Sequence, residues 1–128
     1  MDITPRISSH SMVVQSYKGG QFKVSGQNHT GNIIVLADHV LPWDTGSKDI
    51  ASLSLDDFSP IIQAKRNGAF DVLLMGTGAD FQFLDPALKT ALNQQGIAPD
   101  MMNTGAACRT FNTLLADGRR VCAAMFAA

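Results

Sequence analysis

The sequence contains 128 residues, of which 45% are hydrophobic and only 16% are charged. This length fits one domain, and the apolar content is enough to cover a sheet on both faces without disulfides or metals. Ten basic and eleven acidic residues give a formal net charge of −1, which excludes a broad attraction to phosphate backbones or anionic lipid. Nucleic acid is therefore not an expected partner, and the low charge indicates that part of the surface is covered.

The apolar runs and the cysteines indicate in which cellular compartment the protein is expected. The longest apolar runs are far shorter than the roughly 20 residues that cross a bilayer, so no transmembrane segment is expected. Residues 1–11 lack the apolar stretch of a secretory signal, and we expect an irregular extension there, followed by one α/β domain over residues 12–128. Cys108 and Cys122 form no CxxC pair, which fits a reducing cytoplasm.

The first half of the chain is rich in strand signals. Apolar residues alternate with polar ones on both sides of Lys18-Gly19-Gly20, which predicts a β-hairpin over residues 12–26. Residues 31–37 contain an unbroken apolar run, typical of a strand buried on both faces. Residues 38–43 are then expected to leave the sheet, because Pro42 has no N–H to donate to a ladder.

The second half alternates helices and strands. Ser59-Pro60 and Asn67-Gly68 are start and stop signals of a helix of about two turns. Three strands are predicted after it, at residues 70–75, 99–103 and 119–126. Helices at residues 85–96 and 104–118 separate these strands, each with apolar residues on one face. This order is typical of a layered α/β sheet.

Several segments carry a family resemblance: ADHVLPW at 37–43, LMGTG at 74–78, GIAPDMM at 96–102, and NTGAACRTFNTLL at 103–115 followed by DGRRV at 117–121. Over residues 12–126 the chain resembles the family that contains the mitochondrial respiratory complex I assembly factor 3 and many bacterial and archaeal proteins. The resemblance implies a single three-layer domain with a central mixed sheet of about five strands, flanking helices and an N-terminal β-hairpin element. It also implies binding of partner proteins, and self-association. The absence of an Arg-rich presequence indicates a bacterial member.

The turn Gly76-Thr77-Gly78 directly follows a predicted buried strand. Ligands of α/β sheets sit at such carboxyl ends, where glycine lets the backbone turn tightly toward a helix. The turn lacks the GxGxxG fingerprint of dinucleotide-binding proteins, and no GK[ST] of a phosphate loop follows. Two interpretations stay open, a plain structural turn or part of a ligand or partner cleft.

The helix start at Thr104-Gly105 is the second candidate site. Its backbone N–H groups, the helix dipole and Arg109 can together hold an anion or a partner's carboxylate. A helical wheel turns Arg109 away from the core and puts Asn112 near it. The alternative is an arginine that is solvated or paired with an acid such as Asp117.

The remaining reactive side chains point to no catalytic or metal site. Cys108 lies at the edge of the apolar arc of its helix, which favours a small buried hydrophobe over a nucleophile. The three histidines have spacings that match no zinc or iron site, so no metal and no other cofactor is expected. Adjacent residues of an extended strand face opposite ways, so Asp38 is not expected to orient His39. Trp43 is either a core residue or an exposed aromatic residue at a contact surface.

Two functional hypotheses follow. The first is a protein-interaction domain, similar to an assembly factor, without a reaction of its own. The alternative is a protein or enzyme that binds a small anionic ligand at the carboxyl edge of the sheet. A closed pocket that brings the two glycine-containing turns within about 8 Å would favour the ligand. A flat apolar surface would favour a protein partner.

Overall fold

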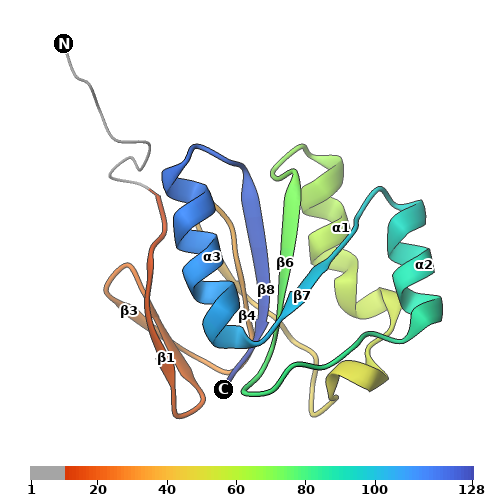
Figure 1. Cartoon of the computed structure of the whole chain (residues 1–128), viewed down its shortest axis with the longest axis horizontal. Coiled ribbons are helices and arrows are strands. Elements are labelled where there is room, and N and C mark those ends of the chain that lie inside the picture. The colour runs from red at the N-terminus through yellow and green to blue at the C-terminus, as the bar shows by residue number, and fades with distance from the viewer. Residues whose placement is uncertain (1–10) are drawn as a thin grey trace.

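A computed structural model describes residues 11–128 of the chain, so the predicted extension at 1–11 lies almost wholly outside the described residues (Figure 1). The smaller of two sheets is antiparallel and contains β1 (Val14–Lys18), β2 (Gln21–Val24) and β3 (Gln27–Thr30). The larger sheet has the order β5-β4-β8-β6-β7 and contains β4 (Ile33–Val35), β5 (Val40–Pro42), β6 (Val72–Thr77), β7 (Asp100–Met102) and β8 (Val121–Phe126). β6 is parallel to β7 and β8, whereas β4 is antiparallel to β5 and β8. The predicted fold class, with its mixed sheet of five strands, is confirmed.

Helices cover both faces of the larger sheet (Figure 1). One face packs against α1 (Ser59–Arg66), α2 (Pro86–Gln94) and the 3₁₀ turns η1 (Ile50–Ser52) and η2 (Leu55–Phe58). The other face packs against α3 (Thr104–Ala116) and the smaller sheet. No helix in the described part of the chain is long and apolar enough to cross a membrane.

The strand β8 explains why the central strands are continuously apolar. Its residues alternate between the two cores, since Val121, Ala123 and Met125 join the α3 side while Cys122 and Ala124 join the α1 and α2 side. All five are buried. A strand buried on both faces has no position for a polar side chain, which is why its sequence does not alternate.

Two details of the first half correct the sequence-based expectations. The segment Gln27–Thr30 forms β3, which was not predicted because it carries no apolar residue and is mostly exposed. It returns along β2 after a tight turn in which Ser25 and Gly26 both have positive φ. The expectation that residues 38–43 leave the sheet is wrong, because β5 pairs with β4. Pro42 lies opposite Ile33 at the end of an edge strand, where a missing N–H is tolerated.

Local capping and turn geometry differ from expectation at two further points. Ser59 is the first residue of α1 rather than its cap, because the preceding 3₁₀ turn η2 runs directly into the helix.

Asp38 and His39 lie in the bend between β4 and β5, not on an extended strand. Their side chains therefore meet at 2.6 Å, and this contact lowers the pKa of the Asp38 carboxyl. Both residues are exposed.

Candidate functional site

The carboxyl edge of the larger sheet is joined to the start of α3 by one residue, Thr104, through both its side chain and its backbone. The hydroxyl of Thr104 accepts a hydrogen bond from the Gly78 N–H at 2.9 Å and donates one to the Phe126 carbonyl at 2.6 Å. The backbone N–H of Thr104 donates to the Gly78 carbonyl at 2.8 Å. Thr104 is fully buried. The two predicted turns are thus in direct contact, and their polar groups at this point bond one another.

Two glycines make this close contact possible. A Cβ atom on Gly76 would lie 2.9 Å from the Thr104 hydroxyl, and one on Gly105 would lie 2.8 Å from Cζ of Tyr17. A side chain at Gly76 would also meet the Thr104 Cα at 3.1 Å and push α3 away from β6, whereas one at Gly105 would displace the Tyr17 ring. Gly76 therefore sets the distance at which the helix packs on the strand.

The helix start is capped by the chain itself. The Asn103 side chain accepts from the Ala106 N–H at 2.8 Å, which satisfies one of the backbone groups that were expected to be available to an anion. Asn112 does not lie beside Arg109 as a surface group. It donates to the Val14 carbonyl and accepts from the Val14 N–H, so it fixes β1 to α3. Arg109 is exposed and forms no ion pair with any residue of 11–128.

Thr77, at the end of β6, holds the loop of residues 78–85, which we call the aromatic loop. Its buried hydroxyl donates to the Asp80 carbonyl at 2.6 Å and accepts from the Gln82 N–H at 3.2 Å. Leu84 is buried in the core, so the loop is also attached at its far end. Hydrogen bonds at one end and apolar packing at the other fix the path of the loop between them.

Two aromatic side chains project from this loop into solvent. Phe81 is 49% exposed and Phe83 is 76% exposed. Leu55, the next most exposed large apolar residue among residues 11–128, is 36% exposed. The two rings are perpendicular, with centroids 4.8 Å apart. The loop runs along the lower edge of the molecule in Figure 1, beside the start of α3. Sequence reasoning missed this pair; the one available signal was two phenylalanines in a segment without strand or helix periodicity.

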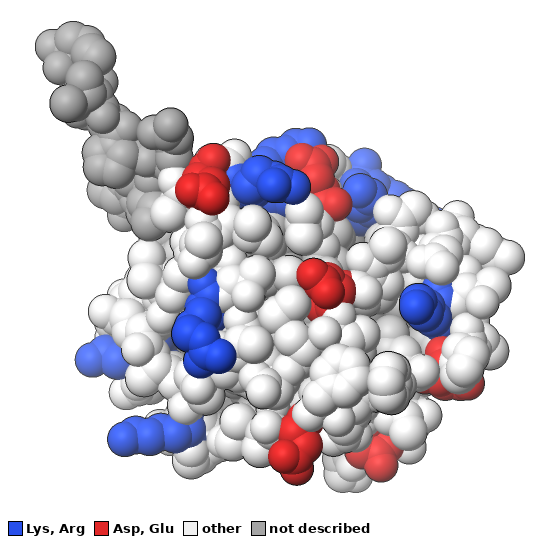
Figure 2. All heavy atoms as spheres, viewed as in Figure 1, with Lys and Arg blue, Asp and Glu red and all other residues white. Residues whose placement is uncertain are grey.

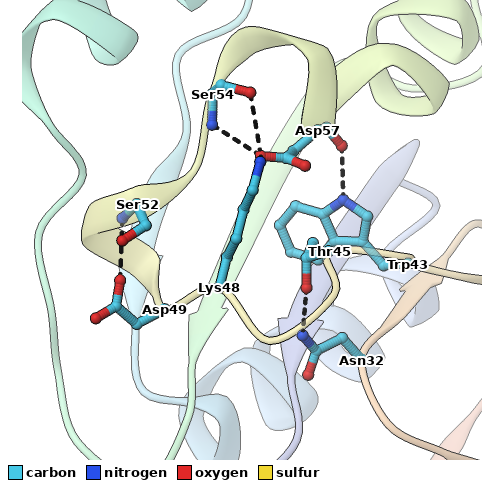
Figure 3. Close-up of polar contacts among 8 residues, drawn as sticks. All are labelled: Asn32, Trp43, Thr45, Lys48, Asp49, Ser52, Ser54 and Asp57. Atoms are coloured by element: carbon cyan, nitrogen blue, oxygen red, sulfur yellow. Dashed lines mark hydrogen bonds and ion pairs between the residues drawn. The ribbon is translucent and has the colours of Figure 1, made fainter.

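Trp43 is a core residue. It is buried, its ring meets Phe58 and Phe126 edge to face at 5.5 Å, and its indole N–H donates to the Asp57 carbonyl at 2.8 Å (Figure 3). Burial of Asp57 opposes ionisation, but the Lys48 ammonium and the Ser54 donors outweigh it and lower the pKa of the carboxyl. This network fixes the segment between β5 and α1.

A shallow hollow opens next to this network, at the ends of β4 and β5. Its volume is about 440 Å³, and its lining includes Asn32, Asp44 and Thr45. Asn32 and Thr45 bond each other at 2.9 Å (Figure 3), and Asn32 also accepts from the Ala127 N–H. The charged residue of this lining is Asp44, and its carboxylate would repel an anion.

Neither cysteine has the environment of a nucleophile. Burial raises the pKa of the Cys108 thiol to about 12, although the positive charge of Arg109 acts in the opposite direction. Burial also raises the pKa of Cys122 to about 12. Both thiols are free, and Cys108 contacts the sulfur of Met125 at 3.6 Å. Over residues 11–128, no three His, Cys, Asp or Glu side chains are grouped to hold a metal ion.

These features define a small three-layer α/β domain whose sheet edge is joined to α3 by its own hydrogen bonds and carries exposed aromatic side chains. The chain belongs to the family described as protein of unknown function DUF498/DUF598, which matches residues 14–126. The chain is 34% identical over 115 residues to a protein of Rhodobacter capsulatus described as uncharacterised, covering 90% of this chain and 84% of that protein. A solved structure described as an outer membrane protein from Bartonella henselae superposes with a TM-score of 0.78 and 32% identity, over 91% of this chain and 95% of that one.

The resemblance to complex I assembly factors is confirmed. The chain is 31% identical over 121 residues to the Xenopus tropicalis protein named NADH dehydrogenase (ubiquinone) 1 alpha subcomplex assembly factor 3, covering 94% of this chain. It spans 63% of the length of that protein. The family therefore includes named assembly factors as well as bacterial proteins without a described role.

Proposed function

We propose that this chain is a protein-interaction domain of the assembly-factor type that catalyses no reaction itself, and that the pair Phe81 and Phe83 is its main contact with a cytoplasmic partner protein. The exposure of this pair is the observation that carries the proposal. Exposed aromatic side chains that neighbour each other mark contact surfaces, and aromatic residues dominate the energy of many interfaces. The names of the assembly-factor relatives support the same class of function.

The energy available from the pair is large enough for an anchor. A phenylalanine side chain presents about 200 Å², so the exposed fractions of 49% and 76% leave roughly 250 Å² for contact. At about 25 cal/mol per Å², complete burial would contribute up to about 6 kcal/mol. This is comparable to the entropic cost of association, so further contacts must supply the remaining affinity.

The residues of the sheet edge have a positioning role in this proposal. Thr77 fixes the aromatic loop, while Gly76, Gly78, Thr104 and Gly105 join the sheet to α3. A loop that is already ordered loses less conformational entropy when the partner binds. Arg109 is kept as a second proposed contact, since it is exposed and has no acidic partner among residues 11–128.

The alternative of a small anionic ligand at this edge has less support. The Gly78 N–H and the Thr104 hydroxyl, which would have to bind the anion, bond each other at 2.9 Å. A ligand could reach them only after these bonds had broken. An enzyme with its active site here would also lack a thiolate nucleophile near neutral pH, because burial raises the pKa of the Cys108 thiol.

Site-specific photo-cross-linking tests the proposal. The photoreactive amino acid p-benzoylphenylalanine replaces Phe83 in one full-length variant and Leu55 in a control, and both are irradiated in cells of the source organism. We expect a discrete cross-linked product with another protein from position 83 and not from position 55. Equal products from both positions, or a cross-link from position 83 only to a second copy of the chain, would contradict the proposal.

A further inference from the structure

The surroundings of the aromatic pair are acidic. Between Asn67 and Leu88 the chain contains no lysine, arginine or histidine. Of the three aspartates in this stretch, Asp71 precedes β6, at the far end of the strand from the loop, and is paired with Arg120, which leaves Asp80 and Asp85 near the pair. Asp80 directly precedes the pair and Asp85 follows it, and both are exposed. Neither forms an ion pair with another residue of 11–128. The next cation along the chain is Lys89, so residues 78–89 contain two aspartates and one lysine.

Figure 2 shows acidic groups in the middle and along the lower part of this face, and others at its top and lower right. Basic groups lie along its left side, at its top and at its right. The lower part is where the aromatic loop runs in Figure 1. An apolar patch beside carboxylates that lack a counter-ion is complementary to a surface that is both apolar and positive.

Resting on the function proposed above, we propose that the aromatic loop binds a basic segment of the partner protein, in which arginine or lysine alternates with apolar side chains. The apolar side chains would cover the rings of Phe81 and Phe83, and a guanidinium group would stack on a ring face. The cationic groups would reach Asp80 and Asp85 on either side of the pair. Arginine fits best, because its planar group can stack on a ring and bond a carboxylate at once.

Two other occupants fit the charges less well. In a twofold dimer of this chain through the same patch, the acidic group around each pair would face the same acidic group of the second copy, and like charges oppose such a contact. An anionic lipid surface would likewise repel Asp80 and Asp85. A basic protein segment satisfies both the rings and the carboxylates.

Peptide probes of defined charge test this inference. A short fluorescein-labelled peptide of alternating arginine and leucine is titrated with the full-length chain and followed by fluorescence anisotropy. The matched probe alternates glutamate and leucine. We expect saturable binding of the arginine peptide, weakening with added salt, and none of the glutamate peptide. The absence of saturable binding up to about 1 mM, or equal binding of the two peptides, would overturn the inference.

Charge variants locate the binding on the loop. Asp80→Asn/Asp85→Asn is expected to weaken binding of the arginine peptide by roughly fivefold or more. The matched control, Asp56→Asn/Asp117→Asn, removes the same charge from exposed positions of η2 and the end of α3 and should leave binding unchanged. Equal weakening in both variants would indicate attraction to the net charge alone and would overturn the inference.

The cross-linking experiment separates the two proposals. The substitution Asp80→Asn/Asp85→Asn is added to the chain that carries the photoreactive group at position 83. If the same partner is captured with unchanged yield, the basic segment is excluded while the protein-interaction function stands. If neither chain captures a partner, the proposed function fails and the inference fails with it. A reduced yield together with peptide binding supports both.

Discussion

Replacing Thr104 by valine tests whether its hydroxyl joins the sheet to α3. Valine keeps the shape of threonine but removes the group that accepts from the Gly78 N–H and donates to the Phe126 carbonyl. An unpaired buried polar group costs about 1–3 kcal/mol, with the lower end expected for the partly buried Phe126 carbonyl. We therefore expect a loss of about 2–4 kcal/mol in the free energy of unfolding. This is a large share of the roughly 5–15 kcal/mol typical of a domain.

Urea unfolding followed by circular dichroism measures this loss. The midpoint should fall while the slope stays the same, because the surface exposed on unfolding does not change. Thr113→Val is the matched control, since Thr113 lies on the exposed side of α3 and should shift stability by no more than about 0.5 kcal/mol. Equal stabilities of the two variants would refute the structural role of the Thr104 hydroxyl.

Three further predictions concern the loop, the thiols and β1. Thr77→Val should increase amide hydrogen exchange at Gln82 and weaken partner binding, because it removes the hydroxyl that fixes the aromatic loop. Unchanged exchange at Gln82 would contradict this role. Cys108 and Cys122 should react with a thiol probe only after unfolding. The pKa of both thiols is about 12 in the folded chain and 9.0 for an unperturbed cysteine, so between these pH values only the unfolded chain loses the thiol protons. The free energy of unfolding should therefore fall as the pH rises from about 9 toward 12, which a titration of Tm would detect. Asn112→Ala should release β1 and lower Tm, because the partly buried N–H and carbonyl of Val14 lose their partner, and limited proteolysis near residue 14 would detect the release.

The later half of the fold was predictable because each of its elements carries an independent local signal. Proline at the start of α2, glycine after it and a spaced apolar face all indicate the same helix. β3 and β5 lack such agreement. β3 is polar throughout, and β5 ends at a proline, so their pairing depends on the neighbouring strands β2 and β4 and not on their own residues.

The sequence drew attention to the carboxyl edge of the sheet but did not give the roles of the residues there. The glycines near the end of β6 and at the start of α3 marked two turns, but the sequence left open whether these turns approach each other. The sequence does not reveal that Thr104 is buried, because a threonine at a helix start is usually a partly exposed cap. Nor does it separate Phe81 and Phe83 from Phe58 and Phe70, which also lie outside the central strands but pack in the core. Exposure depends on tertiary contacts that one chain segment does not encode.

The structure couples the stability of the sheet edge to the shape of the proposed binding surface. Gly78 is bonded to Thr104, and it directly follows Thr77, which fixes the aromatic loop. Loss of the Thr104 hydroxyl should therefore lower stability and also loosen the loop, whereas Phe83→Ser changes only an exposed side chain. We expect Thr104→Val to weaken both unfolding stability and partner binding, and Phe83→Ser to weaken binding by roughly 2 kcal/mol or more at unchanged Tm. Full binding by Thr104→Val despite its lower Tm would mean that Thr77 and Leu84 alone are enough to order the loop.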